Sequence, residues 1–506
     1  MRNLAPYILI LSILFCLLAG CKGNNSSNIG PSYKVDTIPI PQGLLAETGG
    51  LAFFPDGRLI ACFTRGEVMI FDPETEKWDL FAEGLHEPLG IQVVNQSEII
   101  VLQRPELTRI RDTDGDGKAD LYEKITDDFG ISGNYHEFNY GPVMDDHGNA
   151  FIALNTASSG GGIRENVRGE LKLEGRDGED GRRQMFSVVP FRGWVLKVNQ
   201  EGEVIPYASG FRSPNGLGFD GNGNLFVTDN QSDWVETSTF YHVRKGHFYG
   251  HPASLVWEND WKGDDPFSMP IDSLNQLRTR AAVLFPHGIM ANSPTQPVYI
   301  ENNDHFRAFE GQFLVGEMNR ERIVRVMLEK IAGEFQGACV PFMDEQGLRA
   351  GNNRLAFAPD GRLWVGQIAH GWRGDQGIQR ISYTGNPPMD ISAMNLTREG
   401  FKLTFTQPLE KTIALQKDNY QMRQYFYEYK KKPFDEPVDK STQSDLKTVP
   451  IENIGISSDH KTINLTLGEL KPGYVYELKL NNILSKEGRP LDNNLICYTL
   501  NNLRPE

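Results

Sequence analysis

Short apolar runs separated by polar, glycine-containing turns recur along most of the chain. One phrase consists of an apolar strand, a turn with Asp-Gly or Asn-Gly, and a second apolar strand, which together predict a β-hairpin. Clear copies begin at Gly50, Gly141, Gly216 and Leu355, and weaker copies begin near Leu89 and Gly311. Hairpins repeated at irregular spacings of roughly 40 to 95 residues are typical of propeller blades with insertions. The sequence therefore predicts an all-β, six-bladed β-propeller rather than a single large β-sandwich.

The pattern changes near residue 385. From Ser392 onward, alternating strands such as FKLTFTQPL and YVYELKL are separated by turn residues, and the hairpin phrase does not recur. Roughly 120 residues of this kind fit a seven- or eight-stranded immunoglobulin-like sandwich. We expect a propeller over residues 34–385, followed by a C-terminal immunoglobulin-like β-sandwich over residues 386–506.

The N-terminus has the pattern of an export signal. Arg2 precedes the apolar run YILILSILFCLLAG, which is short for a membrane span and ends in small residues before Cys21. This resembles a bacterial lipobox, with residues 1–20 as signal peptide, an acylated Cys21, and a flexible linker over residues 21–33. We expect a periplasmic or outer-membrane lipoprotein of the bacterial cell envelope that contacts the membrane through its lipid anchor only. The alternative is an uncleaved anchor helix.

Composition narrows the class of partner. The chain has 506 residues and a net charge of −15, with no large cluster of Lys and Arg, which argues against a nucleic-acid partner. Beyond the predicted lipobox the cysteines are Cys62, Cys339 and Cys497. Three cysteines allow at most one disulfide, and we expect buried free thiols instead.

The stretch DTDGDGKADLYE has the spacing of an EF-hand calcium loop. Oxygen ligands at loop positions 1, 3, 5, 7, 9 and 12 would come from Asp112, Asp114, Asp116, Lys118 (through its backbone carbonyl), Asp120 and Glu123. Gly117 stands at position 6, where the loop turns sharply, and the apolar flanks suit strands as well as helices. We expect calcium to pin this loop without switching it, since a second EF-hand is missing from the pattern. A solvated acidic turn is the alternative.

A histidine pattern indicates a catalytic site. His136 and Glu137 come just before a predicted blade strand, where propeller loops reach the central axis and ligands bind. Histidine titrates near neutral pH, so His136 is a candidate general base, with Glu137 as a catalytic neighbour. The alternative is a histidine that is only a hydrogen-bonded structural residue.

Further candidates surround the next hairpin and the longest insertion. Arg and Asn beside an aromatic ring are suited to bind sugar hydroxyls and carboxylates. The candidates are Arg212 as a catalytic residue and Asn215, Asp229, Asn230 and Trp234 as substrate ligands. His251 and His287 are further candidate substrate ligands, in loops punctuated by Gly and Pro that we expect to cover the axis. Turn capping by Asp229 and Asn230 and structural packing of the two histidines are the alternatives.

Around His136 and Arg212 the sequence resembles the glucose/sorbosone dehydrogenase family. HEFNYGPVMDDHGNAFIALN, GFRSPNGLGFDGNGNLFVTDN, GQFLVGEMNRERIVRV and NRLAFAPDGRLWVGQ follow the family's blade phrases in order, over roughly residues 36–380. The chain is similar in particular to exported bacterial proteins labelled membrane-bound dehydrogenases. The resemblance implies a six-bladed propeller that oxidises sugars with pyrroloquinoline quinone, in which His136 takes the hydroxyl proton as hydride leaves for the quinone.

The cofactor positions depart from the family. The lysine that holds the quinone falls on Asn319, and an arginine pair falls on Gly351 and Asn353. Carboxylates of a quinone need fixed cations. Candidate replacements are Arg320, Arg349 and Arg354, of which Arg354 is also a candidate substrate ligand.

Three functions remain open on the sequence. The favoured one is a sugar or polyol oxidoreductase with a small carbohydrate substrate and a separate electron acceptor. The second is a carbohydrate lyase or hydrolase that works at the propeller axis without a cofactor. The third is a non-catalytic glycan-binding lipoprotein. Because one fold hosts many functions, the site must decide between them.

Overall fold

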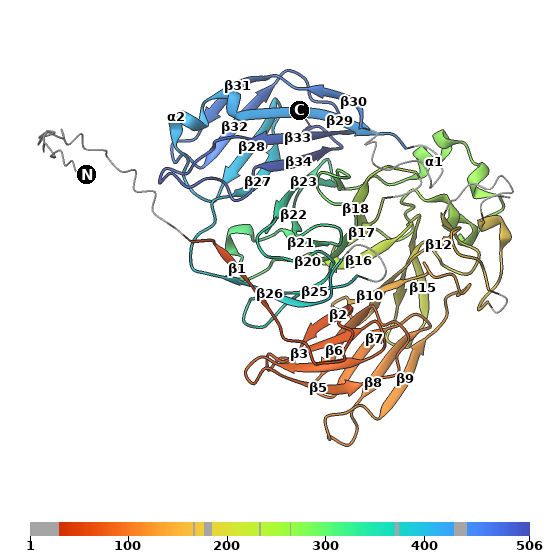
Figure 1. Ribbon diagram of the computed structural model, residues 1–506. Helices are drawn as coiled ribbons and strands as arrows, with labels where there is room; N and C mark the ends of the chain where they lie inside the picture. The colour runs from red at the N-terminus through yellow and green to blue at the C-terminus, as the bar shows by residue number, and fades with distance from the viewer. Residues whose placement is uncertain are drawn as a thin grey trace, which may run out of the picture.

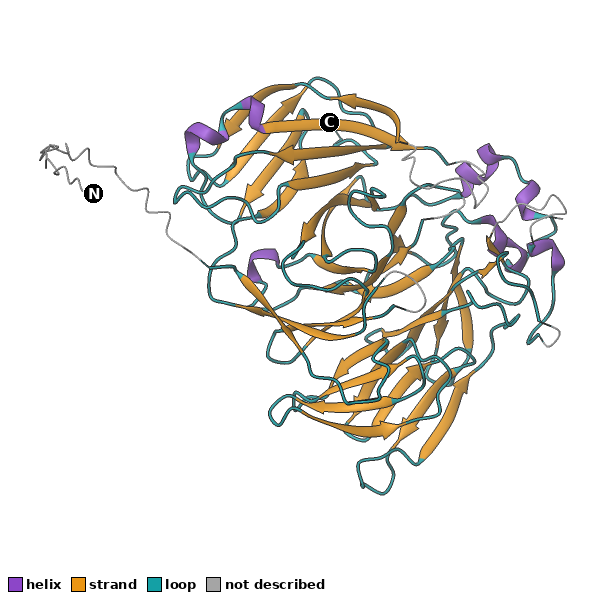
Figure 2. Cartoon of the chain, viewed as in Figure 1, coloured by secondary structure: helices purple, strands orange, loops and turns teal. Residues whose placement is uncertain are grey.

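The computed structural model describes residues 30–164, 167–176, 185–231, 234–263, 265–369, 374–429 and 443–505. The predicted signal peptide, Cys21 and the linker residues up to 29 lie outside these ranges. The described chain is built almost entirely of β-strands, and its short helices gather mainly on insertions at one side (Figures 1 and 2). No helix among the described residues has the length and apolar character of a membrane span.

Six groups of four antiparallel strands make up the first part of the chain (Figure 1). The first two sheets are β2 (Thr48–Phe53), β3 (Leu59–Phe63), β4 (Val68–Asp72) and β5 (Lys77–Ala82), then β6 (Gly90–Asn95), β7 (Glu98–Leu102), β8 (Leu107–Arg111) and β9 (Leu121–Thr126). The third and fourth are β10 (Asn139–Met144), β11 (Ala150–Leu154), β14 (Trp194–Val198) and β15 (Val204–Ser209), then β16 (Pro214–Phe219), β17 (Leu225–Asp229), β18 (Ser238–Val243) and β19 (Val283–Phe285). The fifth group is β20 (Pro294–Tyr299), β21 (Phe313–Glu317), β22 (Ile323–Ile331) and β23 (Glu334–Phe342). The sixth is β24 (Asn352–Phe357), β25 (Leu363–Gln367), β26 (Gly377–Tyr383) and β1 (Tyr33–Thr37).

The first strands of these groups form a closed ring. Each of β2, β6, β10, β16, β20 and β24 contacts the next, and β24 contacts β2. The N-terminal strand β1 pairs antiparallel with β26, so the start of the chain completes the last sheet. Glycines allow the close approach, because a Cβ on Gly90 would lie 1.6 Å from the carbonyl oxygen of Gly141. This closed arrangement of radial sheets is a β-propeller, as the repeated hairpin predicts.

The turn chemistry read from the sequence forms the hairpins. In the first sheet, Oδ1 of Asp56 accepts a hydrogen bond from the backbone N–H of Arg58 at 3.1 Å, and Gly57 takes a φ of +93° that favours glycine. The weak copy near Gly311 needs correction. The hairpin there begins with β20 at Pro294 and connects to β21 through residues 300–312, which include the 3₁₀ helix η4 (Arg307–Phe309) in place of an Asp-Gly turn.

The C-terminal part consists of two sheets that share one core. One sheet has the order β27 (Ile391–Leu396), β28 (Gly400–Phe405), β32 (Thr462–Leu467) and β31 (Ile451–Ile456). The other has the order β34 (Leu495–Leu500), β33 (Tyr474–Leu480), β29 (Tyr420–Tyr427) and β30 (Gln443–Thr448). Buried residues of both sheets, among them Phe401 and Tyr498, pack in one hydrophobic cluster. The short helices α2 (Lys411–Ala414) and η5 (Lys417–Asn419) precede β29. The change from ring to C-terminal sheets falls between β26 and β27.

The two parts are joined by a continuous sheet. β34 pairs with β23 of the fifth group, with Cys339 opposite Cys497. At the same junction the fully buried Arg325 donates to Asp390 at 2.9 Å and to Gln312 at 2.8 Å. All three described cysteines are free and buried, which confirms the expectation for the thiols.

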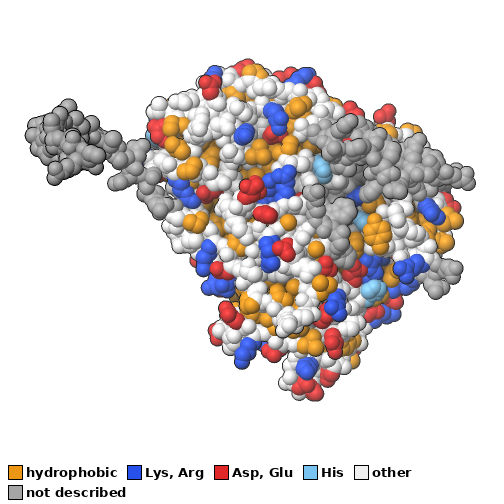
Figure 3. Space-filling view, viewed as in Figure 1, with side chains coloured by type: hydrophobic (Ala, Val, Ile, Leu, Met, Phe, Trp, Pro, Cys, Tyr) orange, Lys and Arg blue, Asp and Glu red, His pale blue; other side chains and the backbone are white. Residues whose placement is uncertain are grey.

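Two insertions add irregular structure to the ring. Between β11 and β14 lie the short strands β12 (Ala157–Ser158) and β13 (Met185–Phe186) and the 3₁₀ helix η1 (Leu173–Gly175). Between β18 and β19 lie η2 (Pro252–Trp257), η3 (Pro266–Ser268) and α1 (Ile271–Leu277). Acidic and basic side chains are interspersed on the face that Figure 3 shows; the absence of a nucleic-acid partner stays a prediction.

Candidate functional site

The imidazole of His136 has a defined tautomer. His136 lies in the loop that enters β10, at the end of the third sheet where β11 finishes. Its Nδ1 atom is 2.8 Å from the carbonyl oxygen of Thr156. A carbonyl oxygen only accepts hydrogen bonds, so Nδ1 carries a proton, and in the neutral imidazole the acceptor lone pair is on Nε2. This is the arrangement of a neutral histidine that can act as a general base.

A buried asparagine shapes this loop. Oδ1 of Asn134 accepts from the backbone N–H groups of His136 and Ser158, both at 3.0 Å. Its Nδ2 donates to the carbonyls of Ser158 at 2.8 Å and Gly161 at 2.7 Å. Asn134 thereby joins the His136 loop to the insertion that follows β11, which limits the positions His136 can adopt.

Two arginines clamp the carbonyls of the same loop. Arg104 pairs with Glu87 and donates to the carbonyls of residues 134, 135 and 137. Arg192 is fully buried and donates to the carbonyl of Glu137 at 3.2 Å and to Oδ1 of Asn139 at 2.7 Å. Burial lowers the pKa of Arg192 to about 10, so it keeps its charge at neutral pH. The two guanidinium groups therefore rigidify the loop, with the carboxylates of Glu87 and Glu137 close to them.

Glu137 supports the loop from inside. Its carboxylate oxygens accept from the hydroxyl of Ser132 at 2.6 Å and from the backbone N–H of Ser132 at 2.8 Å. The side chain is buried. Both oxygens are thus used within the loop, and the geometry assigns Glu137 a positioning role where the sequence suggested a catalytic one.

Thr156 connects His136 to Arg212. The amide N–H and the hydroxyl of Thr156 both donate to the carbonyl of Arg212, at 3.0 and 2.7 Å. The backbone N–H groups of Arg212 and Ser213 donate in turn to the carboxylate of Asp229, at 3.0 and 2.7 Å. The structure therefore places His136, Arg212 and Asp229 along one chain of hydrogen bonds between the third and fourth sheets.

Asp229 has an altered acidity. Burial raises the pKa of its carboxyl to about 6, and the hydrogen bonds from Arg212 and Ser213 offset only part of that effect. At pH values near 6 the group can therefore exchange a proton, which is a property of acid–base residues in functional sites.

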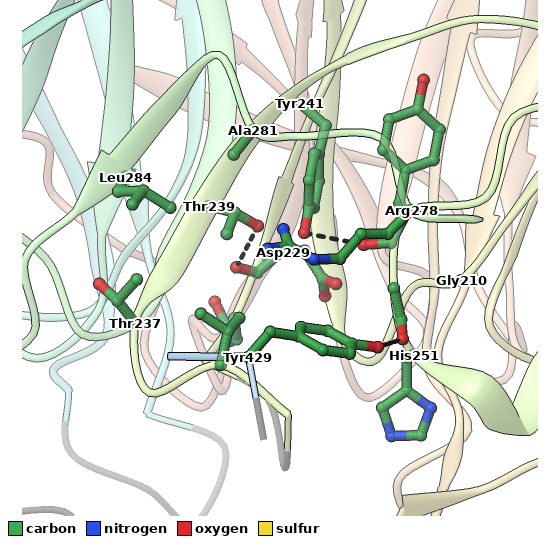
Figure 4. A pocket seen from close by; sticks show the side chains of 14 residues that line it. Gly210, Asp229, Thr237, Thr239, Tyr241, His251, Arg278, Ala281, Leu284 and Tyr429 are labelled. Carbon is green, nitrogen blue, oxygen red and sulfur yellow. Dashed lines mark hydrogen bonds between the residues drawn. The ribbon is translucent and has the colours of Figure 1, made fainter. Parts of the chain in front are cut away.

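A small cavity lies beside Asp229 (Figure 4). Its volume is about 30 Å³, enough for one or two water molecules. Polar lining comes from Asp229, Asn230, Thr237, Thr239, His251 and Arg278, and aromatic lining from Tyr241, Tyr249 and Tyr429. Figure 4 shows Asp229, Arg278 and the ring of Tyr429 near its centre, and His251 at its edge. Three of the predicted ligands, Asp229, Asn230 and His251, thus converge on one cavity.

Two other predicted ligands lie outside it. Trp234 is 1% exposed and stacks between Tyr429 and Phe267, with ring centroids 5.8 and 6.2 Å away. It packs behind the cavity next to His251. His287 is half-buried in the turn after β19, where burial first and the nearby Arg320 second lower its pKa. It does not line the cavity.

Arg354 closes the axis of the ring. Its guanidinium, on a side chain 3% exposed, donates to the carbonyls of Gly49 at 2.9 Å, Leu89 at 3.1 Å, Asn215 at 3.1 Å and Asn353 at 2.7 Å. Burial lowers its pKa to about 10. The N–H groups of the Arg354 guanidinium therefore already donate to backbone carbonyls, where a substrate ligand would have to donate to the substrate. The prediction of Arg354 as a substrate ligand is therefore corrected to a structural role at the ring centre.

Asn215 belongs to the same central network. Its carbonyl and its Oδ1 atom both accept from Arg354, and its Nδ2 lies 3.6 Å from Sδ of Met318. Its side chain is buried. Like Arg354, it holds the ring together at the point where the sequence suggested a substrate ligand.

The residues at the expected quinone positions do not fit that cofactor. Nδ2 of Asn353 donates to the carbonyl of Thr48 at 3.0 Å. A Cβ on Gly351 would lie 2.5 Å from the carbonyl oxygen of Ile368, so a long cationic side chain has no room at that position. Arg354 is committed to carbonyls as described above. These positions provide no fixed cation for the quinone carboxylates.

The two remaining candidate cations lie on neighbouring loops of the fifth and sixth groups. Nη2 of Arg320 donates to the carbonyl of Gly288 at 2.5 Å. Arg349 lies 3.8 Å from the carboxylate of Asp375 and 3.4 Å from the side-chain oxygen of Gln367. Each guanidinium already has a partner in the protein.

The acidic loop joins β8 to β9, at the opposite end of its sheet from the His136 loop. Ligand oxygens of Asp112, Asp114 and Asp116 lie within 4.8 Å of one another. Asp112 also accepts from the N–H of Gly117 at 2.9 Å. Hard cations such as calcium prefer this donor set. The other predicted side-chain ligands bond elsewhere, Asp120 to Thr113 at 2.7 Å and Glu123 to Arg111 at 2.7 Å, while Lys118 stands in the same loop.

Several residues of the site were not predicted from the sequence. Asn134 had a readable signal, because an asparagine two residues before His136 is typical of an Asx turn. The others act through contacts between distant segments and had no local signal: Arg104, Thr156, Arg192, Arg278 and Tyr429.

The fold and the site define a β-propeller with a histidine-containing polar site at one end of its sheets. Residues 71–370 match a family model described as "Domain of unknown function (DUF7133)", and the chain belongs to this family. No curated protein sequence matches the chain.

Among solved structures, the chain is similar to an oxidoreductase of glucose dehydrogenase type from Thermus thermophilus, with 16% identity, a TM-score of 0.46, and coverage of 69% of this chain and 99% of that one. It is also similar to the PQQ-bound aldose sugar dehydrogenase of Streptomyces coelicolor, with 16% identity, a TM-score of 0.46, and coverage of 70% and 99%. A third is the PQQ domain of pyranose dehydrogenase from Coprinopsis cinerea, with 14% identity, a TM-score of 0.46, and coverage of 70% and 96%.

Proposed function

We propose that this protein acts on carbohydrates and that His136 is the general base. The hydrogen bond from Nδ1 of His136 to the carbonyl of Thr156 carries the proposal, because it assigns the acceptor lone pair to Nε2. Asn134, Arg104 and Arg192 hold the loop in place, and a positioned base of this kind raises a rate by about 10²–10⁴-fold. The first candidate reaction is oxidation of a sugar or polyol. His136 takes the hydroxyl proton while hydride leaves the carbon that bears this hydroxyl for a separate two-electron acceptor, and the C–O bond becomes a carbonyl.

A specific observation favours a second candidate. Asn319, Gly351 and Asn353 provide no cations where a quinone would need them, whereas Asp229 supplies a carboxyl with a pKa of about 6 next to the polar cavity. A base and a second titratable group suit a carbohydrate lyase or hydrolase, which needs no electron acceptor. A glycan-binding protein without catalysis is the remaining outcome of the test below.

The architecture and location extend the proposal. We infer that the six groups of four strands are six blades, since their first strands close a ring. The two C-terminal sheets over a shared core support an immunoglobulin-like sandwich. The lipobox pattern supports a lipid anchor at Cys21 in the bacterial cell envelope, and the three converging aspartates support a calcium site.

The test uses the mature chain from Cys21 with calcium present. Pyrroloquinoline quinone is titrated in first and followed by tryptophan fluorescence. A panel of sugars and polyols is then assayed with a redox dye, and a panel of uronate-containing glycosides without any acceptor. Dye reduction that disappears in His136→Ala indicates the oxidoreductase. Product formed without acceptor, also lost in His136→Ala, indicates the lyase or hydrolase. Glycan binding that survives His136→Ala, with no turnover by the unmodified protein, contradicts a catalytic role.

A further inference from the structure

A groove lies between the propeller and the C-terminal sheets. Its volume is about 370 Å³, far more than that of the cavity beside Asp229. The propeller side is the segment around α1, and the C-terminal side is the end of β29 and two loops. Its polar lining includes Asp272, Asn275, Arg278, Arg280, Glu428 and Asn501, and its aromatic lining is Phe426, Tyr427 and Tyr429.

A single layer of side chains separates this groove from the inner cavity. The same residues line both spaces: Val235, Arg278, Ala281, Leu284 and Tyr429. The polar part of the wall is a stacked pair, with the guanidinium carbon of Arg278 4.7 Å from the ring centre of Tyr429. Figure 4 shows both side chains among those that line the inner cavity. The groove and the cavity that holds Asp229 and His251 are therefore adjacent spaces that share one wall.

Side-chain contacts hold the separating pair in place. Nε of Arg278 donates to Oδ1 of Asn275 at 2.7 Å, and the hydroxyl of Tyr429 donates to the carbonyl of Gly250. Arg278 caps the C-terminal end of α1, and Tyr429 follows the end of β29. Rotation about side-chain torsions can therefore separate the two without breaking a strand or a helix.

The lining chemistry indicates the kind of ligand. Among the described residues, neither Arg278 nor Arg280 has a carboxylate partner; Arg280 approaches only the carbonyl of Asn501, at 3.5 Å. Guanidinium groups bind carboxylates through paired charge-assisted hydrogen bonds, and the amides of Asn275 and Asn501 suit hydroxyl groups. Aromatic rings along one wall provide apolar surface for a sugar ring. The acidic side chains in the same lining disfavour a ligand with many negative charges.

We propose that this groove binds a saccharide with a single carboxylate, of the uronate class, and that the Arg278–Tyr429 pair is the gate between the groove and the inner cavity. The choice of a saccharide rests on the proposed function. The groove, the shared wall and the positions of the two arginines are features of the structure and do not depend on the proposed function.

The first test measures binding with a matched pair of ligands. Cellobiouronate and cellobiose, which differ by the carboxylate, are titrated into the mature protein by calorimetry. We expect cellobiouronate to bind at least about tenfold more tightly, because one charge-assisted interaction is worth that much. Arg280→Gln, which changes an exposed groove residue, should remove this preference, and Arg278→Gln should do the same. Arg307→Gln is the control, since Arg307 is an exposed arginine of η4 paired with Asp304.

The second test follows the gate. Trp234 stacks on Tyr429, so its fluorescence reports movement of that ring; the signal is the difference between the unmodified protein and Trp234→Phe. Cellobiouronate should change this signal in the unmodified protein. In Tyr429→Phe, which lacks the hydrogen bond to Gly250, the change should occur faster.

The outcomes separate this proposal from the proposed function. Equal binding of both ligands, or a preference that survives both arginine substitutions, overturns the groove as a uronate site, even where His136-dependent turnover is present. An unchanged Trp234 signal on binding overturns the gate. Carboxylate-dependent binding in a protein without any turnover supports the groove and contradicts the general-base role of His136.

Discussion

Nδ1 of His136 lies 2.8 Å from the carbonyl oxygen of Thr156, and the hydroxyl of Thr156 lies 2.7 Å from the carbonyl of Arg212. One threonine thus orients the imidazole and ties its loop to the next sheet. The consequence is a histidine whose tautomer is fixed by the backbone, which is independent of any bound ligand. The ring is oriented before substrate arrives, so binding does not have to reorient it.

The carboxyl of Asp229 should make stability depend on pH. Burial raises its pKa from an ordinary value near 4 to about 6, so the folded state binds the proton more tightly than the unfolded state. The stability from this group is fully present below pH 4 and is lost as pH rises through about 6, by up to about 3 kcal/mol. Urea unfolding of the protein and of Asp229→Asn between pH 4 and 7 measures this difference. The free energy of unfolding of Asp229→Asn should differ from that of the unmodified protein, but it should not fall in the same way as pH rises. If the two free energies instead differ by the same amount at every pH, the account is contradicted.

Replacement of Arg354 should lower the stability of the propeller at the centre of its ring. Arg354→Met leaves the carbonyls of Gly49, Leu89, Asn215 and Asn353 without their donor in a buried place. We expect a loss of about 3 kcal/mol or more in the free energy of unfolding, because each buried unpaired group costs about 1–3 kcal/mol. The matched control is Arg362→Met, whose guanidinium pairs with Asp360 at the surface and should cost less than about 1 kcal/mol. Equal stabilities, together with weaker sugar binding in Arg354→Met, would restore Arg354 as a substrate ligand.

Calcium should stabilise the protein through the β8–β9 loop. Extracellular calcium sites bind at about 10⁻⁴–10⁻³ M, so about 10 mM calcium adds roughly 1.4–2.7 kcal/mol. Thermal unfolding in calcium and in EDTA measures the shift. Asp112→Asn should abolish it, because Asp112 combines a ligand oxygen with the bonds that shape the loop. Asp304→Asn, at an exposed site in the fifth group, should keep it; a shift that survives Asp112→Asn places the ion elsewhere.

The hairpins could be read from the sequence because their chemistry is local. Asp56 and Gly57 need only their neighbours to make a turn, and the same holds for each strong copy of the phrase. The fifth group shows the limit of this reasoning. Its connection between β20 and β21 contains no Asp-Gly turn, so the sequence placed the hairpin near Gly311 and missed its first strand at Pro294.

The pairing of β34 with β23 could not be read from the sequence. It joins Cys497 to the neighbourhood of Cys339, and no local pattern specifies a partner so far along the chain. The role of Arg354 was hidden for the same reason. Its acceptors come from four separate segments, and only the closed ring brings them to one guanidinium.

The site was partly readable. His136, Arg212, Asp229, Asn230 and His251 were named from residue type and position, and the structure brings them to neighbouring loops. The roles of Arg104 and Arg192 could not be predicted from the sequence. Both look like ordinary surface arginines there, and only the fold brings them to the carbonyls of the His136 loop. The sequence thus indicated the chemical groups of the site, and the structure was needed to identify the backbone contacts that hold them.

The most direct test of the account is the turnover of His136→Gln against that of Tyr135→Phe. Gln keeps a polar side chain but cannot take the proton, and Tyr135 is the exposed neighbour whose hydroxyl contacts Ser158 at 3.3 Å. On whichever carbohydrate the unmodified protein converts, kcat/KM should fall by about 10²–10⁴-fold in His136→Gln and stay nearly unchanged in Tyr135→Phe. Circular dichroism confirms that both variants fold. Turnover by folded His136→Gln at the rate of the unmodified protein would contradict the role of His136 as the base.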